Sequence, residues 1–190
     1  FVDYGPDGTN VFDGGFASAP AMYVLEKIKT AITEKFPQAI ENYEVSYDFP
    51  VFYIKKDEIH QVLEFLKTDT ELNFHFLTDL TGIQSADEKQ LGVIYHLHNM
   101  PKNYRVRLKT YFDINKPEIP TATDLWPGAN WMERETYDFY GIIFTVHPNL
   151  VRILNMDEMV SFPLRKEFPM EDSGRTDKDD RFFGRTINNC

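Results

Sequence analysis

The strongest indication of fold is a pair of neighbouring segments near the middle of the chain. In the second, YRVRLKTYF (104–112), basic side chains at alternate positions are separated by Val106, Leu108 and Thr110. Side chains of a β-strand point alternately to its two faces, so this spacing predicts a strand with one buried and one solvated face. The preceding segment, LGVIYHLHNM (91–100), is joined to it by the turn sequence Pro-Lys-Asn. Together they predict two antiparallel strands.

The segments before this pair predict further helices and strands. Apolar residues recur three or four positions apart from Ala21 until Pro37, which predicts a helix. YEVSY and VFYIK predict a hairpin, a second helix capped by Asp57 follows, and FHFLTDLTGI predicts a third strand. The order α-β-β-α-β-β-β indicates an α+β fold. We expect a two-layer domain with a mainly antiparallel mixed sheet, helices on one face and an extended C-terminal arm.

Changes in composition divide the chain into four parts. Residues 1–20 are rich in Gly, Pro and Asp and predict an irregular N-terminal arm, after which the α+β domain is expected to span residues 21–116. Residues 117–170 begin with a proline-broken linker. They continue with a helix over 128–140, a short strand and an extended arm expected to bind a partner. Residues 171–190 are a charged tail.

The charge and the cysteine content disfavour several classes of protein. The formal net charge is −10 and the pI is near 4.9, which disfavours binding to nucleic acid and to anionic lipid surfaces. The single cysteine, Cys190, cannot form an internal disulfide or hold an iron–sulfur cluster, which normally takes about four cysteines. No apolar run approaches the roughly 18 residues of a membrane-spanning helix. No signal-peptide pattern is present, and the chain begins with Phe1 rather than Met, as expected of a sequence that lacks its original start.

The motifs that identify freestanding enzymes are absent from the sequence. It contains no Walker or dinucleotide-binding loop, no H-E-x-x-H and no G-x-S-x-G. One metal-binding alternative stays open. His96 and His98 lie two apart in a predicted strand and share a face, where His75 from the neighbouring strand could complete a site. The chain would then be a metal-dependent hydrolase. The other interpretation is that these imidazoles lie on a solvated or interface-facing sheet surface.

A charged helix contains the densest group of polar residues. WMERETYDFY carries Glu133, Arg134, Glu135 and Asp138 within six positions. Spacings of four place Arg134 near Asp138 and Trp131 near Glu135 on the helix surface. Two nearby carboxylates could act as acid and base if burial separated their pKa values, or could form weak pairs on a solvated face. Because cofactor motifs are absent, we interpret the group as pairing across a subunit boundary.

Further basic residues follow this helix. His147 comes just after the strand GIIFTV, Arg152 lies in VRIL, and FPLRKEFP brackets Arg165 and Lys166 between two Phe-Pro corners. Prolines stiffen a segment and remove backbone donors, so this one is not expected to be helical. A rigid arm with basic and aromatic side chains suits packing along another protein. An ordinary surface extension is the alternative.

These two signatures closely resemble the NuoC family (the mitochondrial 30 kDa type) of respiratory complex I, the proton-pumping NADH:quinone oxidoreductase. The family pattern is an E-R-E-x-x-D helix, an aromatic-Gly-Ile strand, His-Pro-x-Leu, Arg-Ile-Leu and a Pro-Leu-Arg-Lys arm. The resemblance extends over residues 20–170. It departs from the family pattern at Val146, where the family has Gly, and at Ser161 and Phe162, where the family has Gly-His.

The resemblance implies a peripheral-arm subunit without a cofactor of its own, catalytic only within the assembly. Electrons would pass from NADH through FMN and iron–sulfur clusters in other chains to a quinone. The chain would pack on the quinone-site subunit of the 49 kDa type (D), near the iron–sulfur subunits B and I. It would lie on the cytoplasmic side of the bacterial inner membrane, or on the matrix side in a eukaryote. Homologous subunits of a membrane-bound hydrogenase or of photosynthetic complex I are the alternatives. The residues expected at the partner interface are Trp131, Glu133, Arg134, Glu135, Asp138, His147, Arg152, Arg165 and Lys166.

Overall fold

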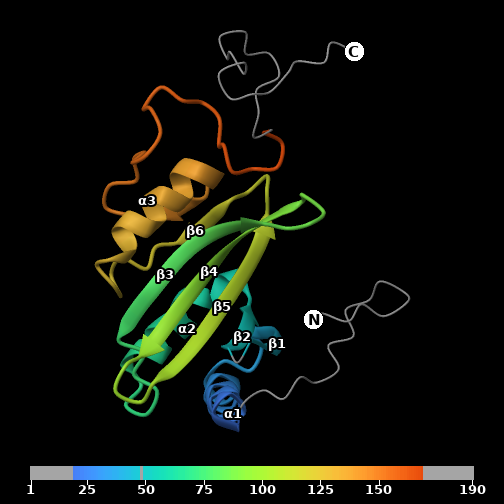
Figure 1. Cartoon of the computed structure of the whole chain (residues 1–190), viewed down its shortest axis with the longest axis vertical. Coiled ribbons are helices and arrows are strands. Elements are labelled where there is room, and N and C mark those ends of the chain that lie inside the picture. Colours follow the sequence, from blue (N-terminus) through green and yellow to red (C-terminus); the bar gives the residue numbers. More distant parts are fainter. Residues whose placement is uncertain (1–18, 48, 169–190) are drawn as a thin grey trace, which may run out of the picture.

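A five-stranded mixed sheet forms the centre of the molecule (Figure 1). The computed structural model describes residues 19–47 and 49–168. Neighbouring strands are antiparallel except for the one parallel pair, β2 and β5, within this sheet. In spatial order the strands are β1 (Ile40–Ser46), β2 (Phe49–Ile54), β5 (Tyr104–Asp113), β4 (Gln90–Asn99) and β3 (Phe76–Gln84). The predicted α+β class, the hairpin and the central antiparallel pair are therefore confirmed.

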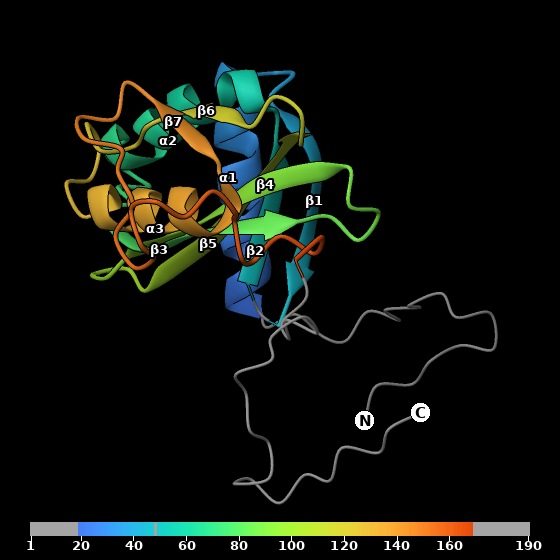
Figure 2. The ribbon, with the colours of Figure 1, turned by 90° about the horizontal axis from the view of Figure 1, so that it is seen from above.

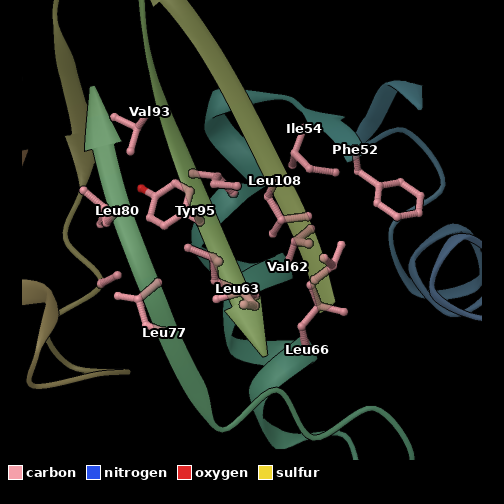
Figure 3. Packing of buried hydrophobic residues seen from close by; sticks show 14 of the residues in the cluster. Phe52, Ile54, Val62, Leu63, Leu66, Leu77, Leu80, Val93, Tyr95 and Leu108 are labelled. Atoms are coloured by element: carbon pink, nitrogen blue, oxygen red, sulfur yellow. The ribbon is translucent and has the colours of Figure 1, made fainter. Parts of the chain in front are cut away.

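Two helices, α1 (Ala19–Lys35) and α2 (Ile59–Thr68), cover one face of this sheet. Figure 3 shows Val62 and Leu63 of α2 facing Leu108 of β5 in a continuous apolar core. The alternation in β5 is as predicted, with Leu108 fully buried and the basic side chains on the opposite face. Burial of apolar area of this kind is the main stabilising contribution to such a domain.

Two details at the helix starts differ from the prediction. The first helix begins at Ala19, so it includes the end of the predicted N-terminal arm; residues 1–18 lie outside the described chain. Asp57 does not cap α2, because it lies inside a short 3-10 helix, η1 (Lys56–Glu58), that runs directly into α2. The N–H of Ile59 already donates to Lys56 O, so this donor of α2 has a backbone partner.

The rest of the described chain packs beside the edge strand β3 and extends the same apolar core, with Ala129 and Phe144 buried in it. It contains β6 (Glu118–Pro120) and β7 (Ile143–Thr145), which pair in parallel, and the helix α3 (Ala129–Tyr140). α3 packs closely on β3, since a Cβ at Gly82 would lie 2.5 Å from the ring of Tyr140. The predicted end of the helix is confirmed: Gly141 adopts φ +69° and donates its N–H to Tyr137 O at 2.8 Å.

The segment from Val146 to Phe168 contains no helix or strand and passes around α3 (Figure 2). It is irregular, as predicted, but it lies against its own domain rather than projecting from it. Leu164 N donates to Phe139 O at 3.2 Å, and Lys166 N donates to Gln84 Oε1 at 2.8 Å. The predicted tail, residues 171–190, lies outside the described residues.

Candidate partner interface

A buried ion pair fastens the irregular segment to α3. The Asp138 side chain is fully buried, and its Oδ1 lies 2.6 Å from Nη1 of Arg152. Its Oδ2 accepts hydrogen bonds from the backbone N–H groups of residues 153–155, at 3.1, 2.8 and 2.9 Å. Burial alone would raise the pKa of this carboxyl, but the N–H donors of Asn155 and Leu154 and the guanidinium of Arg152 hold the pKa well below its ordinary value. Asp138 is therefore ionised and fully hydrogen-bonded.

Arg152 and Arg165 enclose the ring of Phe162. The guanidinium carbons of the two arginines lie 5.2 and 4.8 Å from the ring centroid. Arg165 also donates to Tyr140 O at 2.7 Å, which ties the ring to the end of α3. A Cβ at Gly141 would lie 2.6 Å from this ring. Glycine is thus needed at position 141 both for its backbone conformation and for the close approach of Phe162.

A second buried carboxylate, Glu133, connects α3 to the loop after β6. It accepts hydrogen bonds from the hydroxyl of Thr121 and the N–H of Ala122, each at 2.6 Å. Its Oε2 lies 3.9 Å from Nε2 of His147, and both side chains are fully buried. Burial raises the pKa of Glu133 to about 7 even though its two hydrogen-bond donors lower it.

The same burial lowers the pKa of the His147 imidazole, and neighbouring Arg134 lowers it further. Nδ1 of His147 accepts the N–H of Asn149 at 3.0 Å, while Nε2 lies 3.4 Å from Asn130 O. These contacts fit a neutral ring that carries its proton on Nε2. Glu133 and His147 are thus a buried pair whose charge depends on pH near neutrality.

The pairing that the spacing of Arg134 and Asp138 would allow is not formed. Arg134 instead donates to the carbonyls of Val151 and Arg152, both at 3.1 Å. The Asp138 carboxylate is already bound by Arg152 and by the backbone N–H groups of residues 153–155, so its oxygens are taken. Trp131 is 60% exposed, with the Arg134 guanidinium 5.4 Å from its ring, and Glu135 is exposed as well.

The interface residues predicted from sequence therefore fall into two groups. Most of them are engaged inside the chain, including Lys166, which donates from Nζ to Ser85 O at 3.0 Å. Trp131 and Glu135 instead face outward. Sequence reasoning missed Gln84 and Thr121, which anchor Lys166 and Glu133, because nothing in their local sequence indicates partners so far along the chain.

Large apolar side chains stay exposed around the same helix and segment. We call this set the arm surface. Apart from Trp131 on α3, its members lie in the irregular segment, which Arg134 joins to α3 at Val151 and Arg152. Exposed apolar side chains gathered in one region are typical of a protein-binding surface. The arm surface consists of Trp131, Val151, Ile153, Leu154, Met156, Val160 and Leu164.

The three histidines of the metal alternative are not brought together as a ligand set. His96 Nε2 accepts from Nε of Arg107 at 3.1 Å, while His75 Nδ1 lies 3.2 Å from Asn73 O. Within the described ranges, no three His, Cys, Asp or Glu side chains are placed to hold a metal ion. In the same part of the chain, no helix is both long enough and apolar enough to span a membrane.

Two solved structures resemble this fold. A polypeptide of the membrane-bound sulfane sulfur reductase, an archaeal respiratory membrane complex, is 30% identical with a TM-score of 0.64, over 76% of this chain and 85% of that one. A trypsin-resistant fragment of Nqo5 is 26% identical with a TM-score of 0.56, over 67% of this chain and 99% of the fragment. Both likenesses thus extend well beyond a single helix or hairpin of this chain.

Sequence comparison then identifies the family. The C subunit of NADH-quinone oxidoreductase from Roseiflexus sp. (strain RS-1) is 40% identical over 164 residues, which cover 84% of this chain and 91% of that protein. The family described as "Respiratory-chain NADH dehydrogenase, 30 Kd subunit" matches residues 52–174, a range that includes both sequence signatures. The chain therefore belongs to the 30 kDa subunit (NuoC) family of the respiratory-chain NADH dehydrogenases.

Proposed function

We propose that this chain is a cofactor-free scaffold subunit in the peripheral arm of a proton-translocating NADH:quinone oxidoreductase. It packs on the quinone-site subunit of the 49 kDa type (D), near the iron–sulfur subunits B and I. The assembly lies on the cytoplasmic side of the bacterial inner membrane, or on the matrix side in a eukaryote. Electrons pass from NADH through FMN and iron–sulfur centres in the other subunits to quinone, and the isolated chain catalyses no step.

One observation carries this proposal: several charged side chains of α3 and the irregular segment pair within the chain, while large apolar side chains of the irregular segment stay exposed. Asp138, Arg152 and Arg165 are committed to contacts within the chain. Leu154, Met156 and Val160 beside them are between 63% and 93% exposed. Fixed polar contacts hold an irregular segment in one shape, and a fixed apolar surface is what a stable partner interface needs.

The first test is recovery of the tagged full chain from native membranes. The chain is expected to bring with it the iron–sulfur subunits and NADH:quinone oxidoreductase activity. Recovery of the chain alone, from membranes in which the complex is intact, would contradict a scaffold role.

Glu135→Ala tests the interface separately from the fold. Glu135 is exposed on α3, next to the arm surface, so its loss should leave the free energy of unfolding within about 0.5 kcal/mol of the wild type. We expect less assembled complex with unchanged turnover per complex. Glu41→Ala, an equally exposed carboxylate on β1, is the matched control and should assemble normally. Normal assembly with lost turnover in Glu135→Ala would indicate a direct catalytic role instead.

The second candidate function is the same scaffold role in a related complex that oxidises a different electron donor. The likeness to a polypeptide of the sulfane sulfur reductase complex, at 30% identity, favours it because that assembly is named for a different reaction. The electron donor oxidised by the recovered complex decides between them. NADH oxidation coupled to quinone reduction supports the first candidate, while oxidation of another donor supports the second.

A further inference from the structure

A cleft of about 760 Å³ lies beside the first turn of α3, where Asn130 lines it. Its walls come from three places: the junction of η1 and α2, the loop between β6 and α3, and the turn after β7. Residues before position 116 and residues after it thus both form its sides. Its volume is within the range of ligand-binding clefts in proteins.

The cleft is acidic. Asp57 and Asp124 line it, and no Lys or Arg does, within the part of the chain that the structure describes. Asp124 lies 2.9 Å from Nε2 of His60, which also lines the cleft. Thr121 also lines the cleft, and its hydroxyl donates to the buried Glu133 carboxylate. Carboxylates around an apolar hollow concentrate negative potential in it, which attracts a cation.

The rest of the wall is partly apolar, beside the neutral polar residues Gln61, Thr123 and Thr145. Pro120, Pro127 and Pro148 line the cleft, and the fixed backbone φ of each proline stiffens the wall at these points. Val146 also lines it, is 91% exposed and has a backbone φ of +65°. A β-branched residue is strained in this left-handed conformation, and such strain concentrates at functional positions. In this conformation Val146 presents an exposed apolar side chain on the wall of the cleft.

One polar atom at the cleft has no partner. Asn130 lines it, and Asn130 Oδ1 is buried without a hydrogen-bond donor in the described structure. Buried acceptors are normally satisfied, so this amide oxygen is suited to a donor that arrives with a bound group. The cleft therefore combines proline and valine side chains, acidic residues and an acceptor without a donor in the described structure.

We propose that this cleft binds a basic side chain, Arg or Lys, presented by a partner polypeptide. The methylene stem lies between the proline rings and Val146, and the charged end pairs with Asp57 and Asp124. Long basic side chains bury their stems against apolar surface in this way while keeping the charge paired. The inference rests on the proposed function, because the assembly supplies the partner; it adds an anchoring site separate from the arm surface.

Charge reversal in the assembled complex tests the proposal. Membranes that carry the Asp57→Lys/Asp124→Lys chain are washed with increasing salt, and the retained subunit is quantified. We expect association weakened about tenfold or more relative to the wild type. Glu34→Lys/Glu41→Lys, two exposed carboxylates on α1 and β1 with the same change in charge, should be retained like the wild type.

The outcomes separate the two proposals. Equal retention of the cleft variant and the wild type overturns the cleft proposal, as does equal loss of the cleft variant and the control. Failure of the proposed function is different, because the wild-type chain itself would then be absent from the complex. The single substitution Asp57→Lys controls for misfolding of the double variant, because Asp57 is exposed. It should also weaken retention of the subunit.

A direct probe identifies the chemistry. The full-length chain is titrated with the capped dipeptide acetyl-Leu-Arg-amide while backbone amide signals of residues 121–130 are followed by NMR. The matched neutral probe replaces arginine with citrulline, which keeps the shape and removes the charge. We expect the arginine probe to bind about fivefold tighter or better, and Asp57→Asn/Asp124→Asn to abolish the difference. Equal binding of both probes, or shifts elsewhere in the chain, would overturn the proposal.

Discussion

Two regions of this molecule share one apolar core but differ in how their other buried groups are held. In the sheet layer, residues 19–116, apolar side chains at regular spacing meet in one core, and Leu63 and Leu108 are almost completely buried. In the signature layer, residues 117–168, apolar residues such as Ile119 and Phe144 extend that core. The irregular segment is instead fixed by the Asp138 carboxylate, the Arg152 guanidinium and backbone N–H groups. The contrast shows that charged residues at a family signature can serve the fold of their own chain, while the apolar residues beside them face outward.

Arg152→Ala is expected to have the largest effect and to be confined to the signature layer. It leaves the buried Asp138 carboxylate without its cation, and breaking a buried pair by removing one partner costs about 3–5 kcal/mol. The measurement is amide hydrogen exchange, which should become faster in residues 146–168 while β4 and β5 stay protected. Arg105→Ala, an exposed arginine on β5, should change neither region. Equal loss of protection in both layers would show that they unfold as one unit.

Leu108→Ala is the corresponding destabilising substitution in the sheet layer. Its side chain is fully buried at the centre of β5, and deletion of such a side chain costs about 2–5 kcal/mol. We expect the loss to appear in the global urea unfolding transition and in exchange throughout the sheet. Thr78→Ala, at an exposed position of β3, is the control and should stay within about 0.5 kcal/mol of the wild type. A purely local loosening around β5 would contradict a single cooperative core.

The same contrast explains what could be predicted from sequence. The sheet layer was predictable because strand and helix periodicities place Val106 and Leu108, or Val62 and Leu66, on one side by local geometry alone. The contacts of the signature layer have no period. Lys166 binds Gln84, 82 positions earlier in the chain, and Glu133 binds Thr121 through a loop. A charged helix therefore identified the right segment, but not which of its residues are buried.

The Glu133–His147 pair makes the stability of the signature layer depend on pH. The pKa of Glu133 is about 7 in the folded chain and 4.5 ordinarily, so between these values the folded state holds a proton that the unfolded state has released. The free energy of unfolding from this group therefore falls as pH rises through that window, by up to about 1.4 kcal/mol per pH unit. Burial of His147 acts with the opposite sign, since its lowered pKa removes stability as pH falls below 6.5.

Glu133→Gln isolates the carboxylate, because His147 is present in both proteins. Urea unfolding at pH 5 and pH 7.5 should show that the difference in unfolding free energy, wild type minus variant, decreases towards the higher pH. Glu135→Gln, on the exposed side of the same helix, should keep the wild-type pH profile. A difference between Glu133→Gln and the wild type that does not change with pH would mean that Glu133 is ionised throughout this range.

Val146→Gly should have the smallest effect on stability, and its sign is opposite to that of the other substitutions. Val146 has φ +65°, and release of a non-glycine residue from this left-handed conformation contributes about 1 kcal/mol. Because Val146 is 91% exposed, little packing is lost, so thermal unfolding should move to a higher temperature. Asn103→Gly, at φ +53°, is the matched control; asparagine tolerates this conformation, so its gain should be smaller. If Val146 contacts the bound stem in the cleft, the stabilised Val146→Gly chain should nevertheless bind acetyl-Leu-Arg-amide more weakly than the wild type. A gain in stability with unchanged affinity for the probe would show that Val146 does not contact the bound stem. The strained backbone at Val146 would then have no role in binding.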